Sequence, residues 1–213
     1  MPFPICTTLL ALSLFAHPID GAKGPNLIPN GDFSQGNVGF TSELPYIKPS
    51  FNCLWGGYYT IAPRFDKPQL HELIAPEAFP PAGSPNPKNN VFYANAGGKE
   101  AMVVWSTKVK CQPNTRYQIS FNVISLSGYP VPGPPPHQVA TSEWAPDFEI
   151  WTNGEPSPPI QAGLGEYVRV VMNWDSKTNT TAQVNIVRDK IAHGGGLIGI
   201  SDIQMVSVRV TGK

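Results

Sequence analysis

Four aromatic residues stand where they could bind a sugar: Trp55, Tyr58, Trp144 and Trp151. Flat aromatic rings cover the C–H faces of a pyranose, while polar groups around them bind its hydroxyls. Trp55 and Tyr58 flank a glycine pair that lets a backbone approach a ligand closely. Trp144 lies in a proline-rich segment, and Trp151 alternates with the apolar residues of its own segment. The alternative is ordinary packing of these rings under long loops.

The sequence offers little that could perform catalysis. A group of carboxylates at Glu143, Asp147, Glu149 and Glu155 could hydrolyse a glycosidic bond if two of them faced each other across a groove. Glu-x-Asp-x-x-Glu spacing, a zincin motif and a Gly-x-Ser-x-Gly elbow are all missing from the sequence. We therefore expect a protein that is not an enzyme, with a small glycosidase as the less favoured alternative.

Composition narrows the class of partner. Only 14% of the 213 residues are charged, and the 15 basic residues balance the 15 acidic ones. The average soluble protein has roughly 25% charged residues. A neutral chain without a basic run argues against a nucleic-acid partner.

Alternating apolar and polar residues predict the elements that hold these side chains. In the segment 115–125, Tyr117, Ile119, Phe121 and Val123 share one face and polar residues share the other, which is typical of a half-buried antiparallel strand. Trp105 shares a face with valines and is expected in the core, and Trp174 is expected in the core or at a strand edge. About nine short strands are predicted, which indicates an all-β sandwich or barrel; they cover residues 26–28, 58–61, 91–94, 102–111, 115–125, 147–152, 167–174, 181–187 and 197–210.

The N-terminal residues 1–22 are typical of a secretory signal peptide, because an apolar run spans residues 5–16. The remaining residues, 23–213, are expected to form a single domain, and the protein is expected to be secreted. Two long segments, 75–90 and 128–146, are expected to be loops and are candidates for functional segments.

Cysteine counting agrees with export. Cys53 and Cys111 are an even pair in the mature chain and are predicted to form a disulfide, the alternative being two separate buried thiols. Asn179 begins an N-glycosylation sequon, Asn-Thr-Thr.

Motifs at both ends of the chain resemble a known family. The segment 26–34, Asn-Leu-Ile-Pro-Asn-Gly-Asp-Phe-Ser, and the segment 199–205, Gly-Ile-Ser-Asp-Ile-Gln-Met, resemble the opening and closing segments of galactose-binding-like jelly rolls of secreted carbohydrate-binding modules. Further colinear matches lie at residues 57–61, 90–96, 104–121 and 147–154. The resemblance implies an antiparallel two-sheet jelly roll without catalysis that binds an oligo- or polysaccharide. The alternative is a structural or adhesive sandwich without a sugar site.

The same resemblance implies a structural calcium ion between the first and last strands. Asp202 matches the closing aspartate of the family, and Asp32 is the second candidate ligand. Two parts of the family pattern that supply oxygen ligands are replaced here: an acidic residue by Ser34, and an Asn-Asp pair by the glycines at 194–196. Calcium needs six to eight oxygen ligands, so these replacements bear directly on the expectation.

Overall fold

The computed structural model describes residues 24–48, 57–63, 90–95, 102–125, 147–164, 167–188 and 197–208. The predicted signal peptide, both long loops, Cys53, Trp55 and Trp144 lie outside these residues. The described ranges contain no helix, and hence no helix that is long and apolar enough to cross a membrane.

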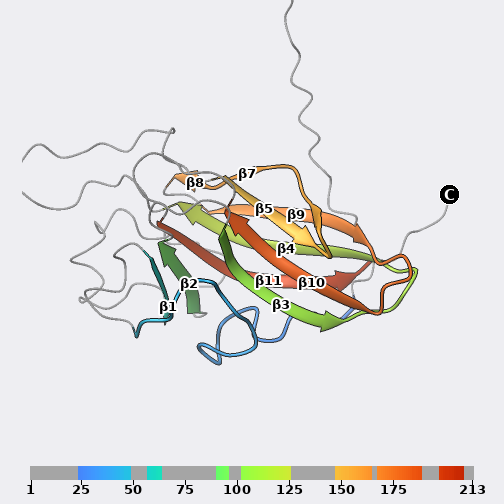
Figure 1. The fold of residues 1–213 in the computed structure, drawn as a ribbon, viewed down its shortest axis with the longest axis horizontal. Helices are drawn as coiled ribbons and strands as arrows, with labels where there is room; N and C mark the ends of the chain where they lie inside the picture. Colours follow the sequence, from blue (N-terminus) through green and yellow to red (C-terminus); the bar gives the residue numbers. More distant parts are fainter. Residues whose placement is uncertain are drawn as a thin grey trace, which may run out of the picture.

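Two sheets lie one over the other (Figure 1). In the six-stranded sheet the order is β1-β2-β11-β4, and both β9 and the short β8 pair with β4. Its strands are β1 (Tyr58–Pro63), β2 (Asn90–Asn95), β4 (Arg116–Ser125), β8 (Gly163–Leu164), β9 (Val168–Asp175) and β11 (Leu197–Ser207). All pairs are antiparallel except β4–β8.

The five-stranded sheet has the order β3-β10-β5, with the short β6 and β7 both pairing with the free side of β5. Its strands are β3 (Met102–Lys110), β5 (Asp147–Thr152), β6 (Glu155–Pro156), β7 (Ile160–Gln161) and β10 (Thr181–Arg188). The predicted antiparallel β-sandwich is confirmed. The described residues form eleven strands: eight of the nine predicted strands, and the two-residue strands β6, β7 and β8, which the sequence did not predict.

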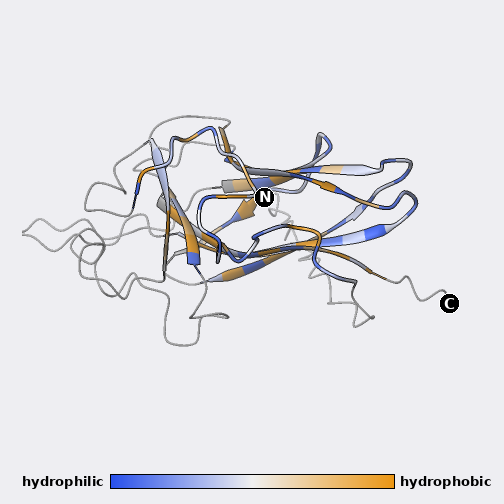
Figure 2. Cartoon of the chain, turned by 90° about the horizontal axis from the view of Figure 1, so that it is seen from below, coloured by the Kyte–Doolittle hydropathy of each residue, from blue (hydrophilic) through white to orange (hydrophobic). Residues whose placement is uncertain are grey.

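The core lies between the sheets, and hydrophobic and hydrophilic residues alternate along the strands that enclose it (Figure 2). Strand β10 buries Ala182, Val184 and Ile186, as its alternation predicted. Trp105 is 1% exposed and stacks near Phe40, which confirms its predicted core position. Trp174 is 4% exposed and contacts the ring of Tyr117.

The prediction that β4 is half-buried is wrong. Its second face carries Gln118, Ser120 and Asn122, and all three are also buried. Two of these side chains form hydrogen bonds with neighbouring strands. Arg169 of β9 donates to the hydroxyl of Ser120 over 2.9 Å, and Asn122 donates to Asp202 of β11 over 2.9 Å. Polar alternation marks the outer side of a sheet, but it does not say whether that side meets water.

The predicted face of β3 is also interrupted. Trp105 and Val109 point to the core as expected, but Val103 is only partly buried, while Met102 and Val104 are buried. The register with β10 shifts between the pairs of Trp105 and Val103. A bulge inserts one extra residue, and alternation therefore changes sides at that point.

The opening segment, predicted as a strand at 26–28, lies beside β11 without forming a regular strand. The backbone N–H of Leu27 donates to Met205, and the side chain of Asn26 accepts from the backbone N–H of Met205 over 2.9 Å. At Gly31 an added Cβ would lie 2.0 Å from the carbonyl oxygen of Ile203. The two end motifs of the sequence therefore meet, and Gly31 allows their close approach.

Candidate binding site on the five-stranded sheet

Trp151 lies on the outer face of the five-stranded sheet. Its neighbours Phe148 and Ile150 are buried in the core, while the indole is partly exposed. The indole Nε1 donates to Oε2 of Glu149 over 2.6 Å, and both residues belong to the same face of β5. This hydrogen bond holds the edge of the indole, which remains partly exposed.

A polar row continues from Trp151 across the sheet. Asn185 of β10 is its cross-strand neighbour, and Ser106 of β3 is the neighbour of Asn185. The hydroxyl of Ser106 donates to Oδ1 of Asn185 over 2.7 Å. Nε2 of Gln183 donates to Ser106 over 2.6 Å and to Oδ1 of Asn185 over 3.2 Å. Packing on the core side of β10 and β3 therefore positions a linked set of amide and hydroxyl groups beside the indole.

The row keeps hydrogen-bonding capacity for a ligand. Within the described residues, Nδ2 of Asn185, Oε1 of Gln183 and Oε1 of Glu149 have no hydrogen-bond partner. One donor, from Asn185, and two acceptors, from Gln183 and Glu149, thus lie on the same sheet face as the partly exposed ring of Trp151. A sugar hydroxyl both donates and accepts, and a pyranose has an apolar C–H face, so this arrangement suits a carbohydrate.

Of the four carboxylates predicted as a possible hydrolytic group, the structure describes the side chains of Glu149 and Glu155. Glu149 accepts from Trp151, and Glu155 forms an ion pair of 2.5 Å with Lys177 at the hairpin tip. Glu143 and the side chain of Asp147 lie outside the described residues. Each of these two carboxylates therefore bonds through one oxygen to a different partner, and a role of the group in hydrolysis stays untested.

The other predicted aromatic contacts are not gathered at Trp151. Tyr58 is 39% exposed on β1, in the opposite sheet, so it belongs to another face of the sandwich. Trp55 and Trp144 lie outside the described residues. Their role in ligand binding stays a prediction.

Asp32 and Asp202, the predicted calcium ligands, line the same cavity of about 340 Å³. Oδ1 of Asp32 accepts from the backbone N–H and the hydroxyl of Ser34, and Oδ2 of Asp202 accepts from Asn122. The described residues contain no group of three or more His, Cys, Asp or Glu suited to a metal. Two carboxylates alone do not make a calcium site, because the ion needs several more oxygens. Calcium binding stays a prediction.

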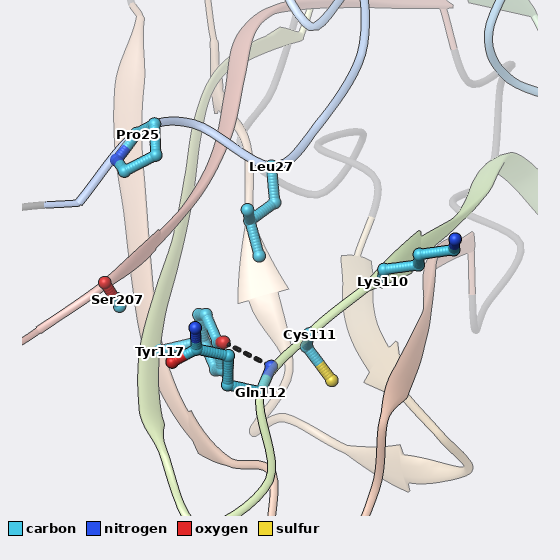
Figure 3. A pocket seen from close by; sticks show the side chains of 7 residues that line it. All are labelled: Pro25, Leu27, Lys110, Cys111, Gln112, Tyr117 and Ser207. Atoms are coloured by element: carbon cyan, nitrogen blue, oxygen red, sulfur yellow. Dashed lines mark hydrogen bonds between the residues drawn. The ribbon is translucent and has the colours of Figure 1, made fainter.

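Cys111 lines a pocket of about 330 Å³ between the opening segment and β4 (Figure 3). Its side chain extends away from the ring of Tyr117, whose hydroxyl accepts from the backbone N–H of Gln112 over 2.8 Å. Burial raises the pKa of the Cys111 thiol, which disfavours the thiolate. The disulfide with Cys53 stays a prediction, since that residue is not described. Asn179 is exposed at a turn, and its use for glycosylation is untested.

No known protein-family model matches this sequence, and no curated protein sequence matches it. Among solved structures, the Stig cyclase Fisc from Fischerella sp. TAU is 12% identical, with a TM-score of 0.53, over 87% of this chain and 98% of that one. At this identity the likeness shows the fold alone.

Carbohydrate-binding modules also occur among the similar structures. A family 61 module in complex with β-1,4-galactotriose is 10% identical over 85% of this chain and 98% of its own, with a TM-score of 0.49. A family 16 carbohydrate-binding module is 15% identical over 84% of this chain and 99% of its own, with a TM-score of 0.43. The structural neighbours thus include sugar-binding modules as well as a cyclase.

Sequence reasoning singled out Trp151 but missed its polar neighbours. Gln183 and Asn185 occupy the outward positions of β10, and Ser106 occupies one of β3. The alternation of Gln183 and Asn185 with apolar residues is visible in the sequence, whereas Ser106 is itself buried. Which strands pair is not visible, so the placement of Asn185 beside Trp151 could not be predicted.

Proposed function

We propose that this chain is a secreted, non-catalytic carbohydrate-binding module that holds a neutral glycan on the outer face of its five-stranded sheet. The observation that supports this most is the partly exposed indole of Trp151, fixed by Glu149 and bordered by free donor and acceptor atoms of Asn185 and Gln183.

Charge supports a neutral ligand. The chain has no net charge, and Glu149 and the exposed Lys108 on the same outer face have opposite signs. Aromatic stacking and hydrogen bonds to neutral groups would supply the binding energy, and such binding depends little on ionic strength. An apolar N-terminal run and the two mature cysteines support export.

A glycan array tests the proposal directly. Wild-type protein and the Trp151→Ala variant are applied at low and high salt. We expect weak retention of a neutral glycan by the wild type, unchanged by salt, and loss of that retention in the variant. Val168→Ala is a suitable control, because Val168 is 37% exposed on the opposite sheet.

Two results would contradict the proposal. If no glycan is retained, or if Trp151→Ala binds like the wild type, the site is wrong and a structural or adhesive role replaces it. Hydrolysis of a retained glycan would contradict the non-catalytic part alone.

A further inference from the structure

A groove lies at the edge of the sandwich, next to the Trp151 face. It has a volume of about 430 Å³ and runs between the segment that begins with β6 and the edge strand β9. Val171 and Met172 of β9 and Pro156 of β6 provide apolar lining. Val171 is 36% exposed and Pro156 is exposed, so this lining is open to solvent.

Polar side chains border the apolar lining. Asn173 is exposed, and Glu155 and Lys177, which form an ion pair, also line the groove. Of the described strands only β4 pairs with β9, so the opposite edge of β9 also presents backbone N–H and C=O groups. Apolar walls with a rim of amide, carboxylate and ammonium groups, including Asp175, match the two-sided chemistry of a sugar.

Pro156 connects the groove with the candidate site. It is the cross-strand partner of Trp151, so the two side chains are adjacent on the same side of the sheet. Pro156 also lines the groove. A ligand that stacks on Trp151 therefore reaches the groove by crossing a single neighbouring strand, roughly 5 Å away.

We propose that the edge groove is a second subsite for the same glycan, so that the protein binds a chain extending from Trp151 over Pro156 to Asn173. This inference rests on the proposed function, and it specifies in addition that the ligand is an oligosaccharide and not a single sugar. The site at Trp151 holds one end of the bound stretch, and the groove holds the other.

An added polypeptide strand fits the groove less well. Strand addition uses a regular row of backbone groups on both partners. Here β9 faces Pro156 and Pro158, which have no N–H to donate, and charged side chains project at the rim. The groove lining therefore favours a ligand that is recognised by side chains.

The experiment uses a length series of β-1,4-linked glucose, xylose and galactose oligomers, from one to six sugars, measured by calorimetry. The test variant is Val171→Lys, which adds a long, charged side chain at a residue that lines the groove. The matched control is Val168→Lys on the same strand, because both valines are similarly exposed and only Val171 lines the groove. Melting temperatures establish that both variants are folded.

We expect wild-type affinity to rise with chain length. Val171→Lys should weaken binding of the longest oligomers by about tenfold, with the shortest bound oligomer unaffected, and Val168→Lys should bind like the wild type. Trp151→Ala should lose binding at every length.

The two proposals fail in different ways. Affinity independent of length, or equal affinities of Val171→Lys and Val168→Lys, would overturn the groove subsite while the loss in Trp151→Ala still supports the sugar site. If the wild type binds none of the oligomers and no glycan on the array, the proposed function fails and the groove inference fails with it. Self-association that Val171→Lys abolishes would also overturn the subsite, since it identifies the groove as a contact between copies.

Discussion

The two sheets carry similar polar rows on their outer faces, yet the rows differ in exposure. On the six-stranded sheet, Ser120 and Asn122 are at most 3% exposed. On the five-stranded sheet, Asn185 and Trp151 are partly exposed. Two asparagines at equivalent outward positions thus occupy different environments. On one face the polar residues Ser120 and Asn122 bond to neighbouring strands in a buried network, and on the other Asn185 and Trp151 keep partial contact with solvent.

Packing beyond the sheet explains part of the contrast. Gly199 of β11 lies on the outer side of the six-stranded sheet, where an added Cβ would meet the side chains of Ile124, Val91 and Tyr93 at 3.0–3.3 Å. Tyr93 and Ile124 are fully buried, although both belong to the outer side. The outer side of the six-stranded sheet is therefore buried around β11 and β4, whereas Trp151 and Asn185 on the other sheet are partly exposed.

The largest effect on the free energy of unfolding is expected for the substitution of Trp105, the tryptophan inside the sandwich. Trp105→Ala removes a ring that is 1% exposed, and we expect a loss of about 3–5 kcal/mol in the free energy of unfolding. Trp151→Ala should lower the melting temperature only slightly. Chemical denaturation of both variants measures the difference, and equal losses would show that Trp151 is also a core residue.

Calcium bound between the terminal segments at Asp32 and Asp202 should have the next largest effect on stability. Chelator should lower the melting temperature of the wild type, and Asp202→Ala should remove this sensitivity. A melting curve that chelator does not change would mean that the two ends are held by hydrogen bonds alone, such as those of Asn26.

The two asparagines provide a matched test of the two faces. Asn122→Ala deprives the carboxylate of Asp202 of a donor within a buried network and should cost about 1–3 kcal/mol. Asn185→Ala should stay within about 0.5 kcal/mol, because water can replace its partly exposed amide. Urea titrations measure both values. A larger loss for Asn185→Ala would reverse the comparison.

The smallest effect concerns an exposed ion pair at the hairpin end. Arg116 donates to both carboxylate oxygens of Asp175 over 2.8 Å, which lowers the pKa of Asp175. Its stabilising contribution is therefore full above the ordinary aspartate pKa of about 3.9 and fades as the pH falls through the lowered value.

Asp175→Asn tests this contribution. The variant should melt slightly below the wild type at neutral pH, and the two melting temperatures should converge in strong acid. A difference that persists in acid would contradict the assignment to this ion pair.

Alternation in the sequence predicted the sandwich and most inward-facing residues, because burial between two sheets imposes a period of two. It predicted Trp105 inside and Trp151 outside the core. It could not predict the buried second face of β4 or the pairing of Asn185 with Trp151, because these depend on contacts between distant segments. The bulge at Val104 could likewise not be predicted, because the sequence does not show where one strand has an extra residue relative to its partner.

Indole resonances offer the most direct test of the central claim that Trp151 is a ligand platform. ¹⁵N-labelled protein is titrated with the glycan retained on the array, and the Nε1–H signals of Trp151 and Trp105 are assigned through Trp→Phe variants. The account predicts a progressive shift of the Trp151 signal, whose N–H is bonded to Glu149, and a constant Trp105 signal. Binding of the glycan with an unmoved Trp151 signal would contradict it.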